Sequence, residues 1–124
     1  MTSRRDARRT AVFLLYQWDL TGRPLASLYE GEIDPYAAEL AGKAQKAAGD
    51  LDARLSAASI GWPAERLGAL ERNVLRVALV ELDAGEVPRE VVLDEAVRLA
   101  KRYSSAEAGR LVNGILGRIA REAA

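Results

Sequence analysis

The stretch LERNVLRVALVEL, residues 70–82, decides the fold, because apolar side chains surround nearly the whole helix that it predicts. At about 100° per residue these side chains fall into two stripes. One stripe is Leu70, Val74, Val77 and Ala78, and the other is Leu75, Leu79 and Leu82. A helix that is apolar almost all round is usually buried, so residues 69–83 are expected to form the central core helix, closed by Gly85.

Outside this helix, helical periodicity covers most of the chain and the alternating pattern of strands is missing, so the sequence predicts an all-α protein. The other expected helices span about residues 4–20, 35–48, 51–59 and 89–102, with a last helix ending near residue 122. The local signals for their ends are Ser3 as N-cap, Asp34–Pro35, a junction at Gly49–Asp50, a break at Gly61–Trp62–Pro63, and a capping box of Ser104 with Glu107.

The composition fits one compact domain over residues 1–124, since 49% of the residues are hydrophobic and 29% are charged. The chain has no cysteine and no histidine. This excludes disulfides, zinc sites of the usual Cys/His kind, and catalysis by Ser-His or Cys-His pairs. No metal or cofactor is expected. No stretch approaches the roughly 20 apolar residues of a membrane span, so we expect a cytoplasmic protein with no membrane partner.

The formal net charge is zero, but the charges are unevenly distributed. Residues 1–10 have a net charge of +3 and residues 98–124 of +4, whereas residues 24–97 have −7. If the two ends meet in space, they form one positive surface on a neutral molecule. The alternative is scatter from a codon bias. That bias explains why arginine outnumbers lysine 15 to 3, but not why acidic residues avoid both ends.

The segment RRDARRTAVFLLYQWDL, residues 4–20, places four arginines at the start of a helix. Positive charge there interacts unfavourably with the helix dipole, at a cost of about 0.3–1 kcal/mol per exposed charge. This cost suggests that a function uses the arginines. Phosphate is the natural ligand of guanidinium groups. A solvated arginine cluster is the alternative. One stripe of this helix combines Arg5, Arg9, Val12 and Tyr16, and an aromatic side chain there suits either a protein partner or an RNA base.

Two further features each have two interpretations. Glu81 lies on an apolar stripe, where a carboxylate needs an arginine, a backbone N–H or a partner residue, and an internal salt bridge is the simpler of these. Gly114 and Gly117 lie inside the last helix at a cost of about 1 kcal/mol each, which suggests that another backbone comes close. That backbone belongs either to a neighbouring helix, which we favour, or to a nucleic acid.

Four segments in this order resemble the NusB family of bacterial transcription antitermination factors: residues 4–20, residues 70–82, VPREVVLDEAVRLAKRYSS at 87–105 and RLVNGILGRI at 110–119. The resemblance is weakest from about residue 22 to 60. It implies two packed three-helix units around long central helices and a non-enzymatic RNA-binding factor. It also implies two partners, the ribosomal protein NusE and the boxA element of ribosomal RNA leader transcripts, which is single-stranded. The complex would keep RNA polymerase elongating.

The resemblance also assigns residue roles. It implies RNA contacts for the arginines of the first helix and for one acidic residue near the VNG motif, and NusE contacts for a tyrosine and a glutamate. The expected RNA-binding residues are Arg4, Arg5, Arg8, Arg9 and Glu107, and the expected partner-binding residues are Tyr16 and Glu81. Lys101 and Arg110 are added from the charge stripe. Leu111 stands where the family often has a phenylalanine that contacts RNA bases.

Three alternatives stay open at this point. The chain could be a NusB-like helical module that binds only protein, without RNA binding of its own. It could form a homodimer that hides its RNA surface, as some family members do. It could also be a small enzyme that uses a pair of carboxylates, although no motif orients them. The candidate carboxylates are Glu39, Asp50, Asp52, Glu81, Asp83, Asp94 and Glu95.

Overall fold

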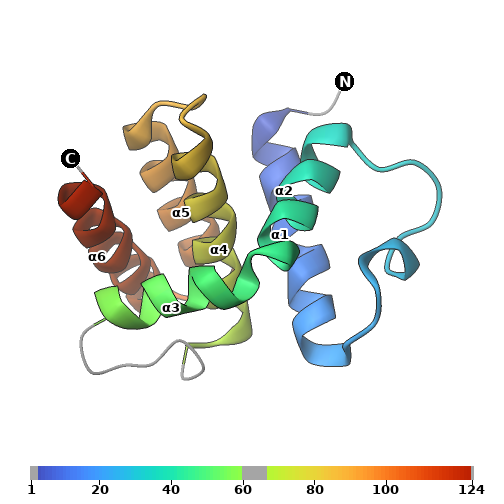
Figure 1. Ribbon diagram of the computed structural model, residues 1–124, viewed down its shortest axis with the longest axis horizontal. Helices are drawn as coiled ribbons and strands as arrows, with labels where there is room; N and C mark the ends of the chain where they lie inside the picture. The colour runs from blue at the N-terminus through green and yellow to red at the C-terminus, as the bar shows by residue number, and fades with distance from the viewer. Residues whose placement is uncertain (1–2, 60–66, 124) are drawn as a thin grey trace.

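The computed structural model describes residues 3–59 and 67–123, and all regular structure within these ranges is helical. The elements are α1 (Arg4–Thr21), a 3-10 turn η1 (Leu25–Ser27), α2 (Pro35–Lys46), α3 (Ala48–Ala58), α4 (Ala69–Ala84), α5 (Arg89–Tyr103) and α6 (Ala106–Ala123). Figure 1 shows their arrangement. The all-α prediction is confirmed for these residues. The predicted break at Gly61–Trp62–Pro63 lies outside them.

Most of the predicted helix ends are confirmed. The Ser3 side chain accepts the Asp6 N–H at 3.1 Å, and the Asp34 carboxylate accepts the N–H groups of Tyr36 and Ala37. Gly85 closes α4 with a φ of +70°, in the left-handed region that favours glycine. These ends were predictable because each depends on a few neighbouring residues.

Two predicted ends are wrong. Ser105, not Ser104, caps α6, because the Ser105 hydroxyl accepts the Ala108 N–H at 3.0 Å while Ser104 is occupied as the last residue of the α5 turn, with its N–H bonded to Ala100. The junction between α2 and α3 lies at Ala47, two residues before the predicted glycine. After Ala47 the chain turns, and α3 runs along the base of the molecule toward α6 (Figure 1).

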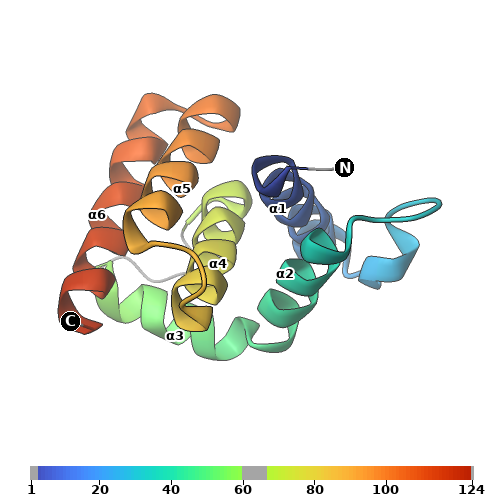
Figure 2. The same ribbon diagram turned by 90° about the horizontal axis from the view of Figure 1, so that it is seen from above.

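The helix at residues 69–84, α4, occupies the centre, as the two apolar stripes predicted. It packs against α1, α2, α3, α5 and α6. The other large contacts are the pairs α1 with α2 and α5 with α6. The pairs α1/α2 and α5/α6 therefore lie on either side of α4 (Figure 2), and α3 contacts α2, α4 and α6. No helix in the described part of the chain is long and apolar enough to cross a membrane.

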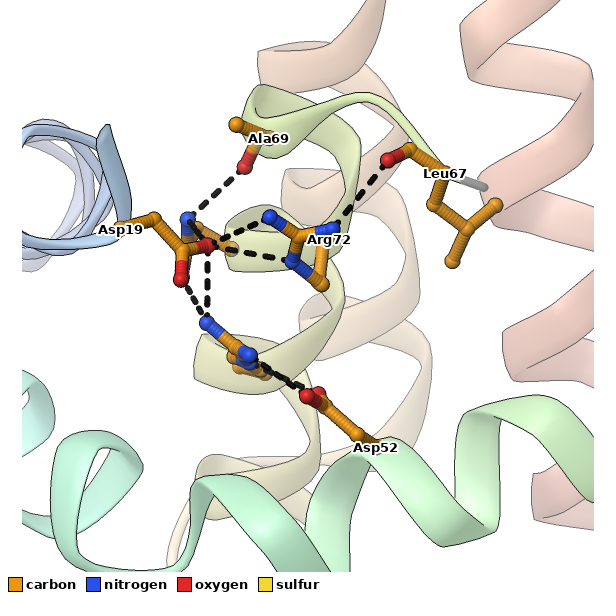
Figure 3. A network of polar contacts seen from close by, with 7 residues as sticks. Asp19, Asp52, Leu67, Ala69 and Arg72 are labelled. Carbon is orange, nitrogen blue, oxygen red and sulfur yellow. Dashed lines mark hydrogen bonds and ion pairs between the residues drawn. The ribbon is translucent and has the colours of Figure 1, made fainter. Parts of the chain in front are cut away.

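A polar network joins α1, α3 and α4 at the side of the core (Figure 3). Asp19 of α1 accepts hydrogen bonds from Arg72, Asn73 and Arg76 of α4, all within 3.1 Å. Arg76 also forms a two-point ion pair with Asp52 of α3, at 2.6 and 2.8 Å. Burial raises the pKa of Asp19, but the hydrogen bonds from Asn73 and Arg72 and the nearby guanidinium charges outweigh it and lower the pKa overall.

Candidate nucleic-acid interface

A cleft between the start of α1 and the second half of α5 brings basic side chains from both ends of the chain together. Its lining is Arg5, Arg9, Glu95, Arg98, Leu99, Arg102 and Tyr103. We call it the α1/α5 cleft. Four of these seven residues are arginines and one is acidic, so the cleft is strongly positive. The expectation that residues 1–10 and the basic C-terminal segment share a surface is confirmed for α1 and α5.

Arg5 is held at one side of the cleft by Glu95. Its Nε and Nη2 atoms donate to the two Glu95 carboxylate oxygens at 2.8 to 3.2 Å. The Arg5 side chain stays 54% exposed, whereas Glu95 is only 13% exposed. The hydrogen bond from Arg5 outweighs burial and lowers the pKa of Glu95, and the same contact raises the pKa of Arg5. Arg5 therefore presents its remaining N–H groups to the cleft in a fixed orientation.

Arg9 and Tyr103 face each other across the cleft. Arg9 makes an exposed ion pair with Asp6 one turn earlier, at 3.1 Å, which is a weak restraint. Hydrogen bonding by Arg102 lowers the pKa of the Tyr103 phenol more than burial raises it, and hydrogen bonding by Arg9 adds to the lowering. The Tyr103 ring packs edge-on against Phe13 with ring centroids 5.0 Å apart. The cleft thus contains an aromatic ring that is fixed by its neighbours.

Arg8 and Glu81 lie elsewhere than the sequence suggested. Arg8 is 5% exposed, and its Nε donates to Glu81 of α4 at 2.6 Å in a buried ion pair. This corrects the expectation that Arg8 faces RNA and Glu81 faces a partner, because neither side chain reaches the surface. The internal salt bridge considered for Glu81 is confirmed. The signal was present in the sequence, since Arg8 shares a helical stripe with Val12 and Leu15, which are buried.

Tyr36 of α2 completes this buried contact. Its hydroxyl donates to the second carboxylate oxygen of Glu81. Burial and then the bond to Glu81 raise the pKa of Tyr36 to about 12, because both disfavour the phenolate. The Arg4 guanidinium lies over the Tyr36 ring, 4.4 Å from its centroid. Arg4 therefore borders α2, and of the four arginines of α1 only Arg5 and Arg9 line the cleft.

A second depression lies on the other side of α5, toward α6, and is called the α5/α6 hollow below. It is lined by Asp94, Val97, Arg98, Lys101, Arg102 and Asn113. The predicted residue Lys101 is therefore adjacent to the cleft, through the arginines that both depressions share. Arg110 is exposed on α6. Arg98, Arg102 and Tyr103 were missed by the sequence analysis, although Glu95, Arg98 and Arg102 follow one helical stripe.

Glu107 and Leu111 lie in a different depression, between the start of α6 and the start of α4, together with Leu67, Gly68 and Glu71. Two carboxylates there disfavour phosphate. Leu111 is 39% exposed, so an aromatic at that position would also reach the surface. Tyr16 is half-buried and lines a neighbouring depression with Phe13, Leu70 and Tyr103. Because Tyr103 borders both this depression and the cleft, Tyr16 is close to the basic surface.

Gly114 and Gly117 of α6 do not mark a close helix contact. A Cβ built at Gly114 meets nothing within 4 Å, and one at Gly117 meets only the Arg121 guanidinium. The favoured interpretation, close packing of a neighbouring helix, is therefore wrong. The close approach is at Gly109, where a Cβ would lie 2.5 Å from Lys101 Cγ.

Most of the candidate carboxylates form ion pairs with basic side chains. Five of them are paired with cations, namely Glu39 with Lys43, Asp52 with Arg76, Glu81 with Arg8, Asp83 with Arg54 and Glu95 with Arg5. Within residues 3–59 and 67–123, no cluster of acidic side chains could hold a metal ion.

The comparisons with known proteins agree with the resemblance. A transcription antitermination protein NusB of Rubrobacter xylanophilus is 44% identical over 121 residues, covering 92% of this chain and 87% of the relative. One of Sorangium cellulosum is 40% identical over 130 residues, covering 97% of this chain and 93% of the relative.

Two solved structures are similar over nearly the whole chain. A chain in the crystal structure of a plectonemic RNA supercoil has a TM-score of 0.89 at 32% identity, covering 99% of this chain and 97% of that one. A chain in the crystal structure of antitermination factors NusB and NusE in complex with dsRNA has a TM-score of 0.84 at 31% identity, covering 96% of each chain. Residues 5–121 match the sequence model of the NusB family. The chain therefore belongs to the NusB family.

Proposed function

We propose that this protein is a transcription antitermination factor that binds RNA through the α1/α5 cleft. The observation that supports this most directly is the convergence of Arg5 and Arg9 of α1 with Arg98 and Arg102 of α5 around one depression. Family membership agrees, because the relatives are named antitermination proteins and a similar structure holds NusB and NusE with RNA. The names of the relatives specify no catalytic activity.

The RNA would be held mainly by its phosphates. Guanidinium groups bind phosphate oxygens in pairs, and such contacts position a nucleic acid without selecting its sequence. Selection requires bases, and bases are accessible in single-stranded RNA. Tyr103 at the end of the cleft offers an aromatic ring on which a base stacks. We therefore propose a single-stranded, boxA-like element of a ribosomal RNA leader transcript as the ligand.

The protein partner would be NusE, at the surface around Tyr16. This residue is half-buried among Phe13, Leu70 and Tyr103, so a partner there would lie next to the bound RNA. Glu81 would act through Arg8 and Tyr36, by fixing α1 and α2 against α4. In the cytoplasm, the assembly of this protein with NusE and RNA would act on elongating RNA polymerase. Arg4, Arg110 and Glu107 remain secondary candidates at the edge of the RNA surface.

The test is the salt dependence of RNA binding. Replacing Arg5 and Arg9 by glutamine removes two phosphate contacts. For single-stranded RNA the slope of log K against log salt should therefore fall in magnitude by about 0.7 per contact. The control variant is Lys43→Gln with Lys46→Gln, which removes the same charge from α2. An unchanged slope in the Arg5/Arg9 variant would refute this role of the cleft.

The same samples separate the alternatives. RNA binding that is strengthened by NusE supports the proposal. Binding of NusE without RNA binding under any salt condition would favour the protein-interaction module. Light scattering at the working concentration shows whether a homodimer forms. If the RNA affinity falls as the protein concentration is raised into the dimer range, the cleft is covered in that dimer.

A further inference from the structure

The α5/α6 hollow lies directly beside the cleft and has features of a second phosphate-binding surface. Arg98 and Arg102 line both depressions, so they stand on a ridge between them. They are one turn apart on α5, about 6 Å along the helix axis. Figure 2 shows α5 between α6 and the N-terminal end of α1. A strand of RNA that leaves the cleft across this ridge would enter the hollow.

The three cations of the hollow outnumber its one carboxylate, Asp94, and form no close ion pair with it. Arg98, Lys101 and Arg102 are all exposed, and none forms an ion pair within the described part of the chain. Other exposed cations are neutralised by nearby carboxylates, as Lys43 is by Glu39 and Arg118 by Glu122. Unpaired cations grouped on one helix face repel one another, and a bound polyanion relieves that repulsion.

Lys101 is positioned by Gly109. A Cβ at Gly109 would lie 2.5 Å from Lys101 Cγ and 3.0 Å from Lys101 Cε, so the lysine stem lies flat on the α6 backbone and depends on the missing side chain. On α6, the Asn113 side chain offers an amide hydrogen-bond donor at the opposite wall of the hollow.

We propose that the α5/α6 hollow is a second RNA-binding surface, in which Arg98, Lys101, Arg102 and Asn113 hold the phosphodiester backbone of nucleotides that continue from the α1/α5 cleft. This inference rests on the proposed function, because it extends the same RNA path. It also has its own consequence. The hollow contributes only to RNA long enough to cross the α5 ridge, whereas the cleft contributes to every RNA that binds.

The test compares RNA lengths. The short oligonucleotide is chosen to be no longer than the cleft, and the long one continues past α5. The main variant is Lys101→Gln with Asn113→Ala, which leaves all cleft residues in place. We expect its affinity for the long RNA to fall at least threefold, with the salt slope reduced by about 0.7, while its affinity for the short RNA is unchanged. The charge-matched control is Arg89→Gln, an exposed cation on the same helix.

A second variant tests the position of Lys101 without changing charge. Gly109→Ala forces the lysine stem away from α6, and we expect it to lower the affinity for the long RNA only. Circular dichroism checks that the helices persist. Equal losses for short and long RNA, or a control loss as large as that of the main variant, would overturn the inference while leaving the cleft intact. If the unaltered protein bound neither RNA, the proposed function itself would fail.

Discussion

The Arg8 guanidinium on α1 and the Glu81 carboxylate on α4 form a 2.6 Å ion pair, and their side chains are 7% and 1% exposed. Tyr36 of α2 donates a hydrogen bond to the same carboxylate. One buried contact therefore joins three helices beneath the surface on which Arg5 and Arg9 lie. A buried charge is tolerated only when its partners are in place, so this contact fixes the helix that supplies the cleft arginines.

Removing Arg8 should destabilise the fold strongly. Arg8→Ala leaves the Glu81 carboxylate buried without its cation, and we expect the free energy of unfolding to fall by about 3–5 kcal/mol, measured by urea denaturation. Arg89→Ala is the control, because Arg89 is exposed. If Arg8→Ala cost no more than this control, Arg8 would not be a structural residue, and its assignment to the RNA surface would return.

Asp19 should matter more for stability than an exposed acidic residue. Asp19→Ala leaves Arg76, whose side chain is 5% exposed, with one acidic partner instead of two, and also removes acceptors from Arg72 and Asn73. We expect a loss of about 3 kcal/mol. Asp83→Ala breaks the exposed pair with Arg54 and should cost less than about 1 kcal/mol. Both losses are measured by urea denaturation. Similar losses in the two variants would contradict the network.

The Arg5–Glu95 pair should make stability depend on pH in the acid range. The pKa of Glu95 in the folded protein lies below its value in the unfolded chain, which is about 4.3 for glutamate. The pair therefore contributes stability fully above that unfolded pKa, and the contribution is lost as the pH falls through the lower folded pKa.

Comparison with Glu95→Gln isolates this effect. The free energy of unfolding, measured by urea denaturation at each pH, should be higher for the unaltered protein than for Glu95→Gln. This difference should shrink as the pH drops below about 4.3. Glu90→Gln is the control, since Glu90 is exposed on the same helix, and its curve should run parallel to that of the unaltered protein. A parallel curve for Glu95→Gln would show that the pair contributes nothing to folding.

Tyr103 should contribute to RNA binding through its ring. Tyr103→Leu removes the stacking surface, and we expect a loss of about 1–3 kcal/mol in RNA affinity, measured by fluorescence anisotropy. Tyr103→Phe keeps the ring and its edge contact with Phe13, so it should bind nearly as well as the unaltered protein. Equal losses in both variants would assign the effect to the hydroxyl group and not to stacking.

Tyr16 should contribute to partner binding. Tyr16→Asp places a charge in the depression with Phe13 and Leu70, and we expect calorimetry to show at least tenfold weaker binding of NusE with helical content retained. Tyr29→Asp is the control, because Tyr29 is an exposed tyrosine in the loop between α1 and α2. Unchanged NusE affinity in Tyr16→Asp would move the partner surface elsewhere.

Features that depend on neighbouring residues were predictable from the sequence. The caps at Ser3 and Asp34 and the Gly85 end of α4 are local hydrogen-bond patterns, and the apolar stripes of residues 70–82 identified the central helix. The uneven charge distribution identified the basic surface. The cap of α6 was misplaced by one residue, because the last turn of α5 competes for Ser104.

Features that depend on tertiary contacts were not predictable in the same way. A helical wheel shows the direction of Arg8 but not that α4 covers it with a carboxylate. It also cannot show that α5 approaches α1, which is what makes Arg98, Arg102 and Tyr103 part of the site. The Asp19 network was missed for the same reason, since its members come from three separate helices.

The central claim is that RNA binds in the cleft between α1 and α5. The most direct measurement is a map of backbone amide chemical shifts while boxA-like RNA is added to the isotope-labelled protein. The account predicts that the largest changes fall on the first two turns of α1 and on the residues around Arg98 and Tyr103 of α5, and that they weaken together as salt is raised. Changes centred on α2 and α3, with α1 and α5 unaffected, would contradict it.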